Sequence, residues 1–170
     1  EQESLFGKLY SRALEYTFMR PHSAKEIRDY LWRKTRTSLV KSRRSGEVTK
    51  RDGVSQSITD RVYDRLLEKG YIDDEKFTKY WIENRNLSKG ASQRKLVNEL
   101  RAKGVEQGII VSLLPSSSRS DESEIDKIIA KKRAKYDDQK LIQYLARQGF
   151  DFDLIKQKIS VAQYPENETD

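Results

Sequence analysis

The chain of 170 residues contains no cysteine, a single histidine and three prolines, and only 35% of its residues are hydrophobic. Without cysteine there is no disulfide and no thiolate for catalysis or zinc binding, and His22 alone does not suffice for a histidine-based metal centre. No stretch approaches the ~18 consecutive apolar residues of a membrane span. The sequence also lacks a phosphate-binding glycine loop and a nucleophile-base pair. We therefore expect a soluble cytoplasmic protein without membrane contact, metal, cofactor or enzymatic activity.

Positive charge is what the chain has in excess, and it is unevenly distributed. There are 34 Lys and Arg against 27 Asp and Glu, a net charge of +7, of which residues 34–57 carry +5 while residues 105–170 carry −2. Segment 34–57 has four apolar residues and is otherwise polar and basic, which predicts a mobile basic arm. The alternative is a short hairpin pairing 38–41 with 47–50 around Ser45-Gly46. The candidate DNA-binding residues of segment 34–57 are Lys41, Arg43, Arg44, Lys50 and Arg51.

Helical spacing of apolar residues recurs through the rest of the chain, and strand patterns are scarce. A first helix must end near Arg20 because Pro21 follows. Ser23 and Glu26 have the spacing of a capping box, which predicts the start of a second helix. Further N-caps are expected at Ser57 or Thr59, Asp73 or Asp74, Ser92, Asp121 or Ser123, and Asp137.

An internal repeat organises these helices. KLVNELRAKGV at 95–105 matches KLIQYLARQGF at 140–150 at an offset of 45, and EIRDYL at 26–31 matches the same pattern at an offset of 69. The second offset is larger by 24, the length of segment 34–57, so this segment is an insertion. We predict an all-α, elongated tandem array of three-helix repeats, because short helices that cannot bury their apolar faces alone must stack. The expected boundaries are 1–69, 70–115 and 116–161, followed by a disordered tail, 162–170.

These motifs resemble the RecX family of RecA regulators. The resemblance is carried by GYIDDEKF at 70–77, by ELRAKGV at 99–105 and by LIQYLARQGF at 141–150, and it covers roughly residues 12–34 and 58–160. It implies tandem three-helix repeats that bind in the groove of the RecA filament and lower its ATPase, strand-exchange and coprotease activities. The insertion 34–57 is longer than the family usually has, so no role is carried over to it.

Two rows of cations on the predicted helices are candidate contacts for RecA or DNA. Arg94 and Arg101 are seven residues apart and share a helix face, and Lys127, Lys131 and Lys135 follow one line. A solvated helix face would give the same pattern. The full set is Arg94, Lys95, Arg101, Lys103, Lys127, Lys131, Lys132, Arg133 and Lys135.

Three other features have plain structural interpretations. Asp73-Asp74 is expected to be a helix N-cap and not a metal site. His22 is expected in a surface or capping role. Trp81 lies on the Phe77 stripe and should be in the core, whereas Trp32 is equally suited to the core or to stacking on bases.

The sequence thus predicts a monomeric, non-enzymatic regulator that binds RecA filaments on single-stranded DNA, with weak electrostatic affinity for the DNA itself, and inhibits filament growth, ATPase and strand exchange. The alternative is a helical DNA-binding protein, sequence-reading or nonspecific, because three-helix units can imitate helix-turn-helix domains. A preference for one duplex sequence would favour that alternative.

Overall fold

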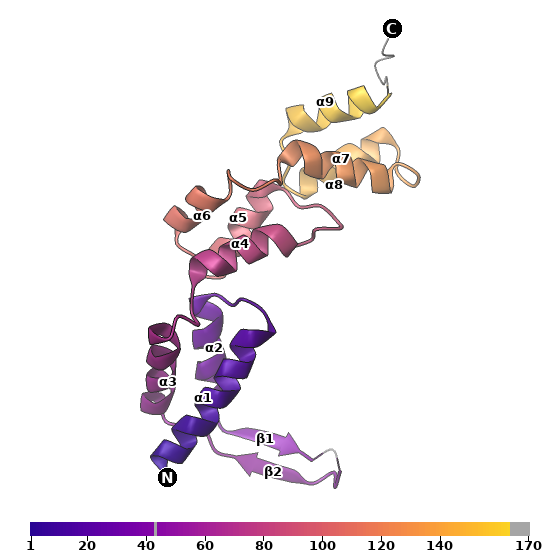
Figure 1. Ribbon diagram of the computed structural model, residues 1–170. Coiled ribbons are helices and arrows are strands. Elements are labelled where there is room, and N and C mark those ends of the chain that lie inside the picture. Colours follow the sequence, from indigo (N-terminus) through magenta and orange to yellow (C-terminus); the bar gives the residue numbers. More distant parts are fainter. Residues whose placement is uncertain (43, 164–170) are drawn as a thin grey trace. The chain divides into compact units, whose positions relative to one another are not determined.

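The computed structural model describes residues 1–42 and 44–163, which form nine helices and two strands in two compact units (Figure 1). Unit 1 comprises residues 1–77 and 103–105, and unit 2 comprises residues 78–102 and the described chain from 106 onward. The elements are α1 (Gln2–Met19), α2 (Ala24–Lys34), β1 (Ser38–Lys41), β2 (Val48–Arg51), α3 (Gln56–Glu68), α4 (Asp74–Asn84), α5 (Gln93–Ala102), α6 (Gln107–Leu113), α7 (Asp121–Lys132), α8 (Asp138–Arg147) and α9 (Phe152–Gln163).

The helices follow one another in groups of three, which confirms the all-α class and the tandem three-helix repeat. In unit 1, α1, α2 and α3 pack around one apolar core; in unit 2, α7, α8 and α9 pack around another (Figure 1). Most of these buried residues lie at the predicted helical spacing, but Leu5 and Leu67, which the spacing also places on apolar stripes, are exposed. The first core contains Leu9, Ala13, Ile27, Leu31, Ile58, Val62, Leu66 and Ile72, and the second contains Ile125, Ile128, Ile129, Leu141, Leu145, Phe150, Ile155 and Ile159.

Helix starts follow the predicted capping chemistry at most positions. The capping box of Ser23 and Glu26 is present in full, and Asp73 accepts the Lys76 N–H at 2.9 Å. Ser92 and Asp137 likewise cap α5 and α8. Two predicted caps are wrong: α3 begins after Ser55 and α7 after Ser120. In both places another serine lies just before the predicted cap, and the chain turns helical there instead. From residue 164 the predicted tail lies outside the described residues.

Within segment 34–57, β1 and β2 form a two-stranded antiparallel hairpin in place of the predicted irregular arm, while Lys34 belongs to α2 and Gln56 and Ser57 belong to α3. β1 pairs with β2 in the register Ser38 to Arg51, so the second strand starts one residue later than the hairpin alternative predicts. Every residue of both strands is exposed. Figure 1 shows the hairpin extending away from α1, α2 and α3.

Two buried serines connect the start of one middle helix to the segment that follows the next. In unit 1, Ser23 Oγ donates to the Lys103 carbonyl at 2.7 Å, and in unit 2, Ser92 Oγ donates to the Gln148 carbonyl at the same distance. Each hydroxyl also accepts the N–H that it caps. We call Ser23 and Ser92 the junction serines. Each hydroxyl makes two hydrogen bonds, one as donor and one as acceptor, so the buried oxygen has a partner in both roles.

Glycine and aspartate complete both junctions. Gly104 and Gly149 follow the accepting carbonyls with φ of +79° and +91°, in the left-handed region that favours glycine. A Cβ on Gly149 would lie 3.1 Å from Ser92 Oγ. The first N–H of each helix donates to an aspartate: Ala24 to Asp74 and Gln93 to Asp121, both at 2.8 Å. The internal repeat seen in the sequence therefore corresponds to a repeated set of hydrogen bonds.

The serine-rich connection 115–120 is anchored by a buried arginine. Arg119 is 5% exposed and its guanidinium contacts both oxygens of Glu124, which is 1% exposed, at 3.1 and 2.7 Å. The same guanidinium donates to the carbonyls of Ile82 and Arg85, where α4 ends, at 2.8 and 2.6 Å. A cation at the C-terminus of a helix satisfies its free carbonyls and favours its dipole. Arg119 thus fixes the connection to both α4 and α7.

His22 lies in the turn between α1 and α2 but is not a surface residue as predicted. It is 6% exposed, and its ring lies 3.9 Å from the ring of Tyr16 between centroids. Burial lowers the pKa of His22, as does the nearby Arg20 charge. The neutral ring is therefore part of the packing at this turn.

Candidate polyanion-binding site

A groove between α5 and α8 in unit 2 contains the residues most suited to a negatively charged partner. It has a volume of about 640 Å³ and is lined on the α5 side by residues from 94 to 102 and on the α8 side by 146–149. Arg94 and Arg147 are exposed, one from each helix. Two guanidinium groups on opposite walls can hold carboxylate or phosphate oxygens in bidentate fashion.

Glu99 is the one carboxylate among the lining residues, and its charge is already compensated. Arg85 donates to both of its oxygens at 3.0 and 3.1 Å, and the Trp81 ring N–H donates at 3.0 Å. Trp81 is half-buried, with its ring N–H bonded to Glu99, and not in the core as predicted. Lys95 donates to Gln148 Oε1 at 3.0 Å across the groove. The groove therefore retains a net positive charge.

The cations of the predicted row on α5 fall into two groups, one exposed to solvent and one paired within the protein. Arg94 and Arg101 are both exposed on α5, two turns apart, and Arg101 donates to the Gln107 side chain at 2.7 Å. Lys103 instead pairs with Glu26 in unit 1 at 2.6 Å. Burial alone would raise the pKa of Glu26, but hydrogen bonds from Arg20 and Lys103 lower it to about 2. Lys103 and Lys95 thus stabilise the junctions, while the two arginines face solvent.

Most cations of the predicted row on and after α7 already make contacts within unit 2. Lys127 pairs with the buried Glu124 at 2.7 Å, and Lys131 donates to the Ser88 carbonyl. Lys132 lies over the rings of Tyr136 and Tyr144, 4.9 and 4.4 Å from their centroids. Two further predicted residues complete the row: Arg133 pairs with Asp138 at 2.5 Å, and Lys135 is exposed beyond the helix end.

The basic residues of the hairpin lie together on one exposed element, apart from the groove residues in sequence. Lys41, Arg44, Lys50 and Arg51 are all exposed, and Arg43 lies outside the described residues. The structure therefore brings Lys41, Arg44, Lys50 and Arg51 onto one hairpin, and it brings Arg94 and Lys95 into one groove.

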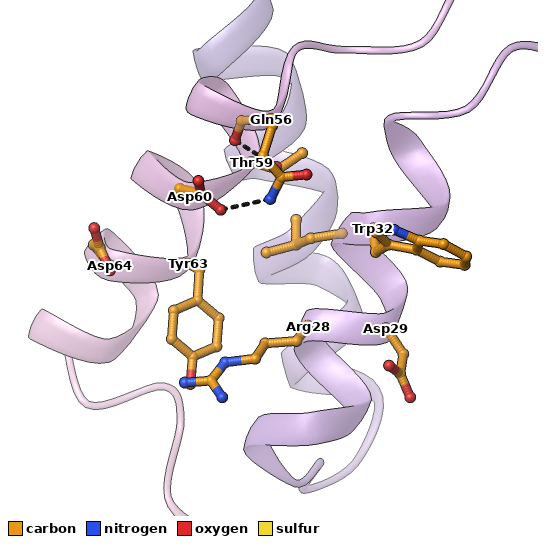
Figure 2. A pocket seen from close by; sticks show the side chains of 9 residues that line it. Arg28, Asp29, Trp32, Gln56, Thr59, Asp60, Tyr63 and Asp64 are labelled. Carbon is orange, nitrogen blue, oxygen red and sulfur yellow. Dashed lines mark hydrogen bonds between the residues drawn. The ribbon is translucent and has the colours of Figure 1, made fainter.

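A second cleft, between α2 and α3 in unit 1, has the opposite charge. It has a volume of about 650 Å³, and Figure 2 shows its lining residues, with Arg28 reaching toward Tyr63. The Arg28 guanidinium lies 4.6 Å from the centre of that ring. Three aspartates outnumber the single arginine, so this cleft does not suit a polyanion. They are Asp29, Asp60 and Asp64.

Sequence reasoning missed Arg147 as a groove residue. It belongs to the LARQGF motif, but the residue that it matches at the offset of 45 is Ala102. The repeat therefore shows no row of cations that includes Arg147. Arg147 comes together with Arg94 only in the groove that both residues line. A comparison of positions facing each other across the junction, rather than along one helix, could have found it.

Within the described ranges, no group of three or more His, Asp and Glu side chains is arranged to hold a metal ion. In the same part of the chain, no helix combines the length and the apolarity that a bilayer span requires.

Tandem three-helix repeats define a helical-repeat protein. A family model described as RecX, second three-helix domain, matches residues 73–114. The regulatory protein RecX of Mycolicibacterium smegmatis is 34% identical over 130 residues, which cover 68% of this chain and 67% of that protein. The chain belongs to the RecX family of regulatory proteins.

Other relatives and structures agree with this assignment. The RecX protein of Mycobacterium sp. (strain JLS) is 40% identical over 80 residues, and this match covers 47% of the chain but less than half, 43%, of the relative. A crystal structure of regulatory protein RecX matches 94% of the chain and 73% of its own with a TM-score of 0.67. That of RecX from Lactobacillus salivarius matches 93% and 96% with a TM-score of 0.61. Both are 16% identical, so they show the fold.

Proposed function

We propose that this protein binds RecA recombinase filaments on single-stranded DNA and inhibits their growth, ATP hydrolysis and strand exchange, with no catalytic activity of its own. Membership of the RecX family supports the assignment. The observation that carries the proposal in this chain is the α5–α8 groove, where Arg94 and Arg147 face solvent and the carboxylate of Glu99 is compensated.

The groove offers a mechanism. Its arginines hold an acidic segment of a filament subunit or a phosphate of the bound strand, and paired guanidinium groups make such contacts directional. A protein built of tandem repeats can engage more than one subunit of a filament, and the second contact then forms at high effective concentration. Adjacent subunits held in one arrangement cannot pass through the cycle of ATP hydrolysis, and the end of the filament cannot extend.

The test is single-stranded-DNA-dependent ATP hydrolysis by the cognate RecA, titrated with this protein at two salt concentrations. We expect inhibition at concentrations too low to coat the DNA. Arg94→Glu with Arg147→Glu should raise the concentration for half-inhibition at least about tenfold, because two attractive contacts become repulsive. The matched control is Lys89→Glu with Lys156→Glu, two exposed lysines of unit 2 that do not line the groove.

Two results would contradict the proposal. Absence of inhibition by the wild-type protein, or inhibition only when the DNA is saturated, would refute the filament as its target. Equal losses in the groove variant and the control variant would refute the groove as the contact, since the charge change is the same in both.

A further inference from the structure

The hairpin has two chemically different faces. Residues opposite each other in an antiparallel pair share a face, and alternate residues along a strand share it too. The register of β1 and β2 therefore places Leu39, Lys41, Val48 and Lys50 on one face, which we call the Leu39 face. The other face carries Ser38, Val40, Thr49 and Arg51.

The Leu39 face combines exposed apolar side chains with cations. Leu39 is 75% exposed and Val48 57%, compared with 37% for Val40 on the opposite face. Each apolar residue lies directly opposite a lysine, Leu39 opposite Lys50 and Val48 opposite Lys41. Like residues are diagonal neighbours, roughly 7–8 Å apart. An isolated two-stranded ribbon gains little from such exposed apolar groups in water, so this face is suited to a partner.

The foot of the hairpin is closely packed against the end of α2. The Val54 N–H donates to the Lys34 carbonyl at 2.9 Å and closes the base. Gly53 lies so near the opposite chain that a Cβ there would be 1.8 Å from the Thr35 carbonyl oxygen. The Arg36 guanidinium stacks 3.7 Å from the centre of the Trp32 ring, which is 48% exposed.

We propose that the Leu39 face binds single-stranded nucleic acid, with Lys41 and Lys50 on phosphates and Leu39 and Val48 against unstacked bases. The alternation of cation and apolar group matches the alternation of phosphate and base along a strand. In a duplex the base faces are stacked and hidden, so the apolar pair would stay exposed. The charge of +5 on segment 34–57 favours a polyanion.

This site requires no RecA and is distinct from the α5–α8 groove. It names the source of direct DNA affinity and does not depend on the proposed regulation. The experiment accordingly uses naked DNA: fluorescence anisotropy of a labelled 20-nucleotide single strand and of the matching duplex, with the full chain, over a series of salt concentrations.

Three variants separate the faces. Lys41→Gln with Lys50→Gln should weaken single-strand binding about tenfold and reduce the slope of log affinity against log salt by about 1.4, since each phosphate contact contributes roughly 0.7. Leu39→Ser with Val48→Ser should weaken it at least about fivefold with the slope unchanged, because the loss is apolar. Arg44→Gln with Arg51→Gln removes the same charge off this face and should change affinity less than about twofold.

The amide spectrum of the hairpin, compared with that of the wild-type protein, checks that each variant keeps the paired strands. If the double lysine variant and the double arginine variant lose the same affinity for the single strand and the same salt dependence while the hairpin stays formed, the binding is nonspecific and the proposal is wrong. Duplex bound as tightly as the single strand would overturn it as well. Either failure leaves RecA inhibition untouched and can be told apart from failure of the proposed function.

Discussion

Replacing Arg119 by alanine should destabilise unit 2 by about 3–4 kcal/mol. Removal of one partner from a buried ion pair typically costs about 3–5 kcal/mol, because the other charge stays buried. Here Glu124 keeps two hydrogen bonds after the change, from the Ala91 N–H at 2.8 Å and from Lys127 at 2.7 Å. This places the expected loss in the lower part of that range. The carbonyls of Ile82 and Arg85 also lose their donor, which brings the total loss to the upper end of about 3–4 kcal/mol.

The assay is urea unfolding followed by Trp81 fluorescence in a Trp32→Phe background. Trp32 and Trp81 are the only tryptophans and lie in units 1 and 2, so the remaining signal reports unit 2. The matched control is Arg133→Ala, which removes an ion pair of the same type. Arg133 and Asp138 pair at 2.5 Å, but both side chains are 35% exposed.

The control should lose less than about 1 kcal/mol, because exposed ion pairs are screened by solvent. A loss for Arg119→Ala within about 1 kcal/mol of the control would refute the role given to the buried pair. A steeper slope against urea in the variant, without a change of midpoint, would contradict it too, since the change would then lie in the unfolded state.

Three further changes test the junctions and the α5 surface. Ser92→Ala should lower the free energy of unfolding by about 1–2 kcal/mol, measured by urea titration, because α5 loses its N-cap and the Gln148 carbonyl its donor; Ser92→Thr should restore most of it. Glu26 has a pKa lowered from 4.5 to about 2. Its contribution to the free energy of unfolding is therefore complete above pH 4.5 and is lost as the pH falls toward 2. Glu26→Gln should remove this acid-sensitive part, no more than about 3 kcal/mol, from a series of unfolding curves between pH 2 and 6; a variant with the wild-type pH profile would contradict the assignment. Arg94→Glu with Arg101→Glu should reduce inhibition of RecA ATPase less than the groove pair does, and equal effects would mean that the α5 face, and not the groove, makes the contact.

The sequence predicts what depends on nearby residues. Helical spacing and the cap at Ser23 are local, so the helices and the repeat could be read from the pattern of 95–105 against 140–150. For segment 34–57 the sequence predicts an arm, with the hairpin as the alternative, because two exposed strands lack the apolar alternation that a buried sheet imposes. Strands of only four residues have too little strand propensity to favour the hairpin over an irregular arm.

The functional surface was less predictable because it depends on pairing between distant segments. Arg119 lies in a serine-rich connection without periodicity, yet it is among the most buried charged residues of the described chain. Lys127 has the spacing of an exposed row, but a buried carboxylate three residues away takes its charge. Helix periodicity gives the face on which a cation lies, and it does not say whether tertiary contacts have already used it.

The two junction serines also set a chemical limit on how such repeats can be joined. A hydroxyl can accept the capping N–H and still donate to a carbonyl of another segment, as Ser23 and Ser92 do. The third middle helix is capped by Asp137, which accepts the Lys140 N–H at 2.8 Å but, as a carboxylate, has no proton to donate. No repeat can therefore be joined to α8 through the bond that Ser23 and Ser92 donate. Asp137→Ser would supply the missing donor and give α8 the same junction chemistry as α2 and α5.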